Sequence, residues 1–181
     1  VGAGTGATVG KFLGDEFSMK GGLGTASVKV GKLVVGALVV VNCLGDVIDP
    51  DTGQIIAGAL NKDKTGFADI MELIRRGVSG KESIGRNTTI GVVATNAMLS
   101  KAAANKVASM AHNGLSRTIR PVHTMYDGDT IFCMATGKVE SDISIVGTLA
   151  ADIMSKAVVR AVERAETLYE RICCRDLRGP S

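Results

Sequence analysis

The sequence predicts an α+β fold in which antiparallel sheets are covered by helices. Two adjacent segments, residues 21–30 and 32–41, show the alternation and the apolar content that are typical of strands. Residues 100–114 and 145–173 instead repeat small apolar residues at helical spacing and carry charged residues on the opposite face. Because helices with a small-residue face pack closely on sheets, this succession predicts one layered domain.

The composition is that of a globular protein. The 181 residues are enough for one domain with a substantial core and too few for two. A formal net charge of +3 without a basic run, with 3% aromatic residues and no Trp, argues against nucleic acid as a partner. The longest apolar run, residues 33–41, is too short to cross a bilayer, so no membrane association is expected.

The four cysteines fit reduced thiols. Cys43 and Cys133 lie in apolar, strand-like runs, whereas Cys173 and Cys174 are adjacent near the end of the chain. Adjacent cysteines rarely bond to each other, and no spacing matches a metal site. We therefore expect a cytoplasmic protein, since thiols stay reduced in that compartment.

The first half of the chain predicts a glycine-rich loop, a hairpin and a short helix. Residues 1–13 (VGAGTGATVGKFL) lack the preceding strand and the spaced acid of a dinucleotide-binding fingerprint, and they lack the residues of a phosphate loop. Residues 21–41 predict one hairpin whose second strand ends at Asn42, and residues 46–53 predict a loop. Residues 67–76 have helical spacing.

A strand and a helix follow in the second half. Residues 79–86 are polar and bear glycine, which makes them the natural place for a backbone cut. Residues 89–97 predict a strand, and Ser100 then caps a helix that we expect to end at residues 113–114. His112 is expected to be a surface or capping residue of that helix.

The last third predicts a hairpin and the longest helix. Asp127-Gly128 is a strong signal for a tight hairpin turn, and it precedes a strand through residues 131–133. Residues 145–173 keep one apolar face throughout and predict a single helix. Residues 175–181 form a polar tail.

The junction at residues 84–97 (IGRNTTIGVVATNA) carries the candidate chemistry. A loop ends at Asn87, and an apolar run begins at Thr88. A hydroxyl at the mouth of a strand can attack the carbonyl just before it, and hydrolysis of the resulting ester leaves a free α-amine that serves as base for that hydroxyl. The alternative from this stretch alone is a loop before a core strand, with threonines favoured only by their β propensity.

Five segments considered together point to a family: GAGTGATVGK, GGLGTAS, NTTIGVVATNA, RPVHTMYDGDTIFCMATG and the long final helix. Their order and spacing resemble the L-aminopeptidase/D-amino-acid esterase family, which includes the β-aminopeptidases and is similar to the nylon-oligomer hydrolases. The resemblance covers nearly the whole chain. It implies a four-layer αββα sandwich, two packed sheets between helices, as in the aminopeptidase/ornithine acetyltransferase-like fold.

The resemblance also implies roles for particular residues. Thr88 matches the nucleophile that self-cleavage exposes at the start of the second subunit. Asn42 matches the amide that helps to form the oxyanion hole, and Lys11 matches a lysine near the site in the nylon-hydrolase-like branch. Asp127 and Asp129 match the paired carboxylates that orient the new α-amine.

Self-cleavage between Asn87 and Thr88 would divide the single domain 1–181 into residues 1–87 and 88–181, which stay associated. Family members are much longer, so we expect a preceding N-terminal part that supplies further site residues, including a tyrosine near the oxyanion. Many relatives carry a serine nucleophile, and an aspartate where Asn96 stands, which leaves the local charge open. The relatives also imply a homo-oligomer, a tetramer or larger.

The predicted function is hydrolysis of amide bonds in short peptides, amino-acid amides or esters, or β-peptides. It proceeds through an acyl-enzyme on Thr88 and needs no metal or organic cofactor. An ornithine acetyltransferase-like acyltransferase on the same fold is the second hypothesis, because an amine can take the acyl group in place of water. The third is a non-catalytic scaffold that assembles with copies of itself, which the apolar strands would support equally.

Overall fold

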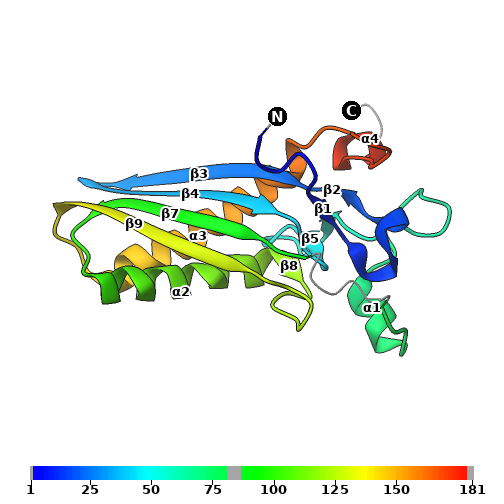
Figure 1. The fold of residues 1–181 in the computed structure, drawn as a ribbon, viewed down its shortest axis with the longest axis horizontal. Helices are drawn as coiled ribbons and strands as arrows, with labels where there is room; N and C mark the ends of the chain where they lie inside the picture. Colours follow the sequence, from blue (N-terminus) through cyan, green and yellow to red (C-terminus); the bar gives the residue numbers. More distant parts are fainter. Residues whose placement is uncertain (1, 81–86, 179–181) are drawn as a thin grey trace.

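The computed structural model describes residues 2–80 and 87–178, and its centre is a four-stranded sheet (Figure 1). The sheet has the strand order β3 (Gly22–Val30), β4 (Leu33–Val41), β7 (Ile90–Ala97) and β9 (Thr130–Val139). β4 is antiparallel to both of its neighbours, whereas β9 runs parallel to β7. The expected antiparallel sheet is therefore mixed, because the chain crosses from β7 to β9 through a helix.

The hairpin predicted from residues 21–41 is confirmed. Strands β3 and β4 pair along their whole length, from Val30 opposite Leu33 to Gly22 opposite Val41. The burial of β4 alternates residue by residue, as expected for a strand that has one face against the core.

Helices α2 (Lys101–Thr118) and α3 (Ile143–Glu163) cover one face of this sheet and pack against each other (Figure 1). The approach of α3 is close because both surfaces are made of small residues. A Cβ added to Gly24 of β3 would lie only 2.0 Å from the carbonyl oxygen of Ala157 in α3. The small-residue face predicted for the final helix thus determines how near it comes to the sheet.

The end predicted for the second-half helix is wrong. As predicted, the helix begins after Ser100, whose side chain accepts a hydrogen bond from the N–H of Ala103. It does not end at residues 113–114, however, and continues through Gly114 to Thr118. A Cβ on Gly114 would lie 2.5 Å from the carbonyl oxygen of Ala151, so this glycine permits the contact between α2 and α3. Tertiary packing, and not a C-terminal cap, explains the glycine.

The other helices are shorter than predicted. α3 ends at Glu163, and the chain then turns before a separate short helix, α4 (Cys174–Arg178). α1 (Ile70–Arg75) begins three residues after the start predicted at residue 67, because Asp69 caps it by accepting the N–H of Glu72. Within the described residues, no helix has both the length and the apolar content to cross a membrane.

Short elements gather at one end of the main sheet. They are β1 (Thr8–Val9), 3-10 helix η1 (Lys11–Leu13), 3-10 helix η2 (Asp15–Phe17), β2 (Met19–Lys20), β5 (Asp46–Ile48), β6 (Ile55–Ala57) and β8 (Ile119–Arg120). β1 pairs with β2, and β5 pairs with β6 and β8. The loop predicted at residues 46–53 therefore begins with a fully buried strand.

The hairpin predicted at Asp127-Gly128 is absent. Strand β8 pairs with β5, and β9 pairs with β7, so the strands on either side of the turn are not partners. The Asp-Gly turn closes locally, with the N–H of Asp127 donating to the carbonyl oxygen of Thr124 at 3.1 Å. The turn leads directly into the first residue of β9.

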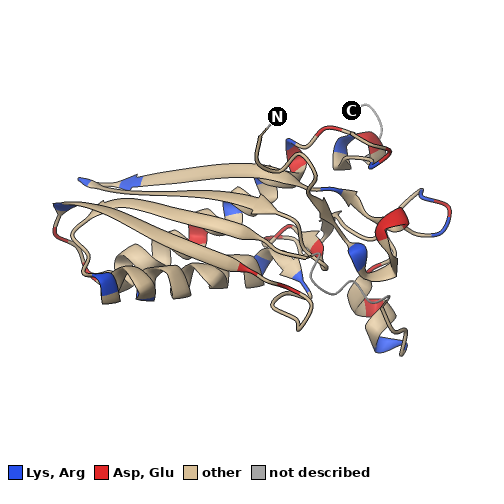
Figure 2. Ribbon diagram, viewed as in Figure 1, with Lys and Arg blue, Asp and Glu red and all other residues tan. Residues whose placement is uncertain are grey.

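The sheet face that the two helices leave open is apolar. Along most of their length the strands carry no charged residue, and Figure 2 shows the charges near the strand ends and on the helices. The large exposed side chains on this face are Leu23, Val34, Leu38, Ile90, Phe132 and Met134. The predicted α+β class is confirmed, and this open face is the kind of surface that the second sheet of a four-layer sandwich covers.

Candidate active site

The predicted site residues lie at one end of the main sheet, where strands begin or finish. Asn42 directly follows β4, Thr88 lies just before β7, and Asp127 and Asp129 precede β9. The end of β4 and the starts of β7 and β9 meet there, because β4 is antiparallel to β7 and β9 is parallel to it. Lys11 reaches the same place from η1, with its Nζ 2.8 Å from the Oδ1 of Asn42. All five predicted residues thus lie in one neighbourhood.

The peptide bond between Asn87 and Thr88 is held on both sides. The carbonyl oxygen of Asn87 accepts the N–H of Gly128 at 2.8 Å, and the N–H of Thr88 donates to the carbonyl oxygen of Asn42 at 2.8 Å. The Thr88 hydroxyl lies against Gly128, where an added Cβ would be 2.8 Å from Oγ1. The carbonyl and the amide are therefore held by hydrogen bonds, and the hydroxyl lies beside the glycine whose N–H the carbonyl accepts.

Asn42 is oriented by two donors. The Nζ of Lys11 lies 2.8 Å and the N–H of Thr8 lies 3.1 Å from its Oδ1, so the NH2 group is the opposite, donating end of the amide. Lys11 is only 2% exposed. Burial lowers the pKa of Lys11, an effect that Cys43 and nearby acidic groups oppose.

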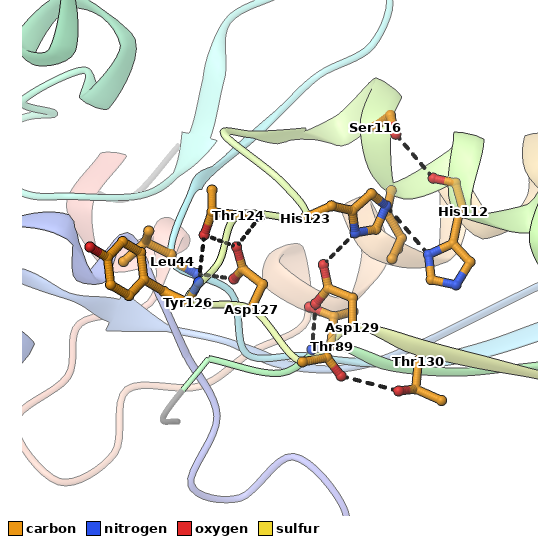
Figure 3. Close-up of polar contacts among 12 residues, drawn as sticks. Leu44, Thr89, His112, Ser116, His123, Thr124, Tyr126, Asp127, Asp129 and Thr130 are labelled. Atoms are coloured by element: carbon orange, nitrogen blue, oxygen red, sulfur yellow. Dashed lines mark hydrogen bonds and ion pairs between the residues drawn. The ribbon is translucent and has the colours of Figure 1, made fainter. Parts of the chain in front are cut away.

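The two predicted aspartates have different partners (Figure 3). The Oδ2 of Asp127 accepts both the N–H and the hydroxyl of Thr124, at 3.0 and 2.6 Å. The Oδ1 of Asp129 accepts the N–H of Thr89 at 2.9 Å, and its Oδ2 lies 2.8 Å from the Nδ1 of His123. In the continuous chain, the N–H of Thr88 is bonded to Asn42, while Asp129 holds the next residue along.

Sequence reasoning missed two residues of this neighbourhood. Gly128 was read only as part of a hairpin turn, and His123 lies inside the RPVHTMYDGDTIFC stretch without an assigned role. His112, expected at the surface or as a cap, is partly exposed, and its ring meets that of His123 edge to face. In the part of the chain that the structure describes, no group of three His, Cys, Asp or Glu side chains could hold a metal ion.

Comparison with known proteins assigns the chain to a family. The profile of peptidase family S58 matches residues 1–172. The chain belongs to this family. The match extends over every segment of the candidate site, from Lys11 to Asp129.

Curated relatives of this S58 member are named as uncharacterized aminopeptidases and as 6-aminohexanoate-oligomer endohydrolases. An uncharacterized aminopeptidase of Mycobacterium leprae is 42% identical over 93% of the chain and 49% of its own length. A 6-aminohexanoate-oligomer endohydrolase of Paenarthrobacter ureafaciens is 30% identical over 88% of the chain and 49% of its own length. The chain thus spans about half the length of the curated relatives that it matches.

A solved structure shows the same fold. The L-aminopeptidase D-Ala-esterase/amidase of Ochrobactrum anthropi, described as a variant of the Ntn-hydrolase fold, superposes with a TM-score of 0.63. The match covers 97% of this chain and 48% of that one at 20% identity. The resemblance to the L-aminopeptidase/D-amino-acid esterase family is confirmed by these findings together.

Proposed function

We propose that this S58 member is a self-processing amide hydrolase whose nucleophile is Thr88. The observation that carries the proposal is the geometry of the bond before that residue. The Asn87 carbonyl oxygen accepts the N–H of Gly128 at 2.8 Å, and the Thr88 hydroxyl lies beside the same glycine. A donor on the oxygen and a hydroxyl close to the carbonyl carbon are what an acyl shift at this bond requires.

Self-cleavage follows from this arrangement in two steps. Thr88 Oγ attacks the carbonyl carbon of Asn87, the C–N bond breaks, and the hydroxyl proton ends on the nitrogen of Thr88. Negative charge that develops on the Asn87 oxygen is stabilised by the N–H of Gly128, which already lies 2.8 Å away. Water then hydrolyses the ester, leaving a carboxylate on Asn87 and a free amine and hydroxyl on Thr88.

Turnover uses the same hydroxyl and the new amine. The amine takes the proton of Thr88 Oγ as the hydroxyl attacks a substrate carbonyl, and it passes that proton to the leaving amine. The NH2 end of Asn42, oriented by Lys11 and Thr8, supplies a donor for the substrate oxyanion. Asp129 already accepts the N–H of Thr89, so its carboxylate lies one residue from the new amine. Water releases the acyl group.

The two pieces stay together after the cut. Strand β4 belongs to the first piece and β7 to the second, and they pair from Val35 opposite Thr95 to Val40 opposite Ile90. Helix α3 of the second piece also packs on both β3 and β4 of the first. Cutting one peptide bond leaves this shared sheet and core intact, so residues 1–87 and 88–181 form one unit.

The substrates we propose are short peptides, amino-acid amides or esters, and β-peptides. The family is a peptidase family, and relatives are named as aminopeptidases and as 6-aminohexanoate-oligomer endohydrolases. These compounds share an unhindered amide or ester carbonyl, which is the group that a Thr88 acyl-enzyme needs.

Denaturing mass spectrometry of the purified protein tests the proposal. The wild type is expected to give a fragment that begins at Thr88, while Thr88→Ala stays a single chain and Thr88→Ser is still cut. Amide and ester probes should be hydrolysed only by the preparations that are cut. A folded wild type that remains one intact chain would remove the basis of the proposal.

A further inference from the structure

The two histidines of the chain form a row of contacts that ends at Asp129, with His123 between His112 and the carboxylate (Figure 3). His123 comes from the loop before β9, and its Nδ1 is 2.8 Å from the Oδ2 of Asp129. His112 comes from α2, and its Nδ1 is 3.3 Å from the Nε2 of His123. The rings meet edge to face, with centroids 4.9 Å apart. Two residues 11 positions apart in the chain thus form one row with the carboxylate.

The chemistry of the row determines where its protons are. An ionised carboxylate only accepts hydrogen bonds, so Nδ1 of His123 carries the proton that it shares with Asp129. In the neutral ring, Nε2 of His123 is then an acceptor, and the Nδ1–H of His112 is its donor. Burial is the largest cause that lowers the pKa of His112, which favours the neutral form of its ring.

The row connects the protein surface with a buried carboxylate. The side chain of Asp129 is 2% exposed, whereas that of His123 is 35% exposed. The second oxygen of Asp129 accepts the N–H of Thr89, directly after the proposed nucleophile. Each oxygen of the Asp129 carboxylate therefore accepts one hydrogen bond. Rotation of the side chain would break the bonds to Thr89 and to His123.

The two rings are supported in different ways, one by a helix and one by a loop. His112 belongs to the 18-residue helix α2, whose neighbouring Val107, Ala111 and Leu115 are buried in the core. His123 has φ 54°, a left-handed backbone conformation in which histidine, asparagine and aspartate are enriched among the residues other than glycine.

We propose that His123, supported by His112, is a positioning residue that holds Asp129 on the backbone beside Thr88. This role of His123 rests on the proposed function, because Asp129 holds the backbone next to the proposed nucleophile, Thr88. His123 acts through Asp129 and does not itself touch the reacting atoms. Without the bond from His123, the carboxylate is free to turn away from the N–H of Thr89, and the Thr88 hydroxyl and amine lose their fixed place.

Substitutions at position 123 separate the hydrogen bond from the ring and from the backbone conformation. In His123→Asn, the Nδ2 of the new side chain takes the place of the histidine Nδ1 and can still donate to Asp129, and asparagine tolerates φ 54°. His123→Leu has similar bulk but no donor, and His123→Gly, which also lacks a donor but adopts φ 54° without strain, should lose as much activity if the hydrogen bond and not the backbone is responsible. We expect His123→Leu to slow self-cleavage and to lower kcat by about 10- to 100-fold, the usual cost of losing an orienting partner. His123→Asn should recover most of that loss.

Further variants test the rest of the row. His112→Phe keeps an aromatic ring against His123 but removes its donor, so its rate should lie between those of wild type and His123→Leu. Ser116→Ala is the matched control on the same helix, because the Ser116 hydroxyl bonds only to the carbonyl oxygen of His112 among the contacts of this row. Its rate should equal that of wild type, and KM should stay near wild type in all of these variants.

A readout that needs no catalysis separates this inference from the proposed function. Nitrogen NMR of the imidazole rings in the Thr88→Ala chain, at a pH where both rings are neutral, should show the proton of His123 on Nδ1. A proton on Nε2 overturns the inference, as does a folded His123→Leu that is cut and turns over like wild type. If the wild type is never cut at Thr88, the proposed function fails, and the NMR result alone decides whether His123 holds Asp129.

Discussion

Gly128 donates its backbone N–H to the carbonyl oxygen of Asn87 across 2.8 Å. The bond extends the parallel pairing of β7 with β9 beyond the strands themselves, since Asn87 also forms a bridge with Asp127. One step further on, the N–H of Thr130 donates to the carbonyl oxygen of Thr89 at 3.0 Å. The proposed cleavage bond is thus fixed by sheet hydrogen bonds, and the turn that was taken for a hairpin provides the donor.

Gly128→Ala is expected to slow the proposed self-cleavage by at least about tenfold, because misplacing a reacting group by about 1 Å can cost 10²-fold. The new Cβ would lie 2.8 Å from the Oγ1 of Thr88, which is closer than carbon and oxygen can approach without movement. The fraction of cut chain is followed over time by denaturing mass spectrometry.

Gly6→Ala is the control for this substitution. Position 6 is also glycine, lies in a turn of the N-terminal segment, and has no atom within 4 Å of an added Cβ. Its rate of cleavage should match that of wild type. Equal rates for the Gly128 and Gly6 variants would show that the hydroxyl does not need the place in which the structure puts it.

Local patterns were sufficient for the elements that depend on local interactions. Alternation gave the β3–β4 hairpin, and the position of Ser100 gave the start of α2 because an N-cap acts on its own helix. The same local rules failed at Gly114 and at Asp127-Gly128. There, the contact with α3 and the pairing of β9 with β7 determine the structure, and both partners lie far away in the sequence.

The candidate site was predictable only through family resemblance. The local sequence around Thr88, Asn42 and Asp129 carries no distinctive pattern. The three residues meet because the end of β4 and the starts of β7 and β9 lie side by side in the sheet. His123 could have been singled out, since it is one of two histidines and lies six residues before Asp129.

Gly114→Ala should reduce the free energy of unfolding by about 1–3 kcal/mol, the usual cost of overpacking a core. Its Cβ would lie 2.5 Å from the carbonyl oxygen of Ala151 and 2.7 Å from the Cβ of Met154, so α2 must move away from α3. The measurement is urea unfolding in the Thr88→Ala background, which keeps the chain continuous.

Gly147→Ala is the matched comparison from the opposite helix. Its Cβ would meet Met110 mainly at the flexible end of the side chain, at 2.3 Å from Sδ and 2.5 Å from Cε. Methionine can rotate away, and alanine favours the helix over glycine by about 1 kcal/mol, so the net change should be small. If both variants lose the same stability, backbone contact at Gly114 is not what limits the approach of the helices.

Asp46 should make stability fall as pH rises from about 4 to about 7. Burial raises the pKa of this carboxyl from 3.8 to about 7. The N–H groups of Ile70 and Ala59, which donate to its oxygens, lower the pKa but do not cancel the effect of burial. The folded state therefore binds a proton that the unfolded state has already lost in this range. The stabilisation by the protonated carboxyl is fully present below the pKa of the unfolded state and is lost above the pKa of the folded state. At about 1.4 kcal/mol per pKa unit, this stabilisation amounts to roughly 4 kcal/mol.

Asp46→Asn isolates this contribution. The variant cannot titrate, so its free energy of unfolding should change less between pH 4 and 7 than that of the parent chain. It should also be less stable at the acid end, since its NH2 group faces an N–H donor that the carboxyl oxygen accepted. Parallel curves of unfolding free energy against pH for the two chains would contradict the raised pKa.

Asn42→Asp should leave the fold intact and lower the rate of substrate hydrolysis by about 10²–10³-fold, the typical effect of removing one oxyanion donor. The new carboxylate still accepts the Nζ of Lys11 and the N–H of Thr8, so the packing around it persists. It no longer offers an NH2 group, and its negative charge opposes that of a tetrahedral intermediate.

Asn96→Asp is the matched control at the far end of β7, where Oδ1 accepts the N–H of Val34. Initial rates on an amide probe, with cut fractions matched by mass spectrometry, should fall in the first variant alone. Equal losses in both would mean that added charge, and not the lost donor at Asn42, slows the reaction.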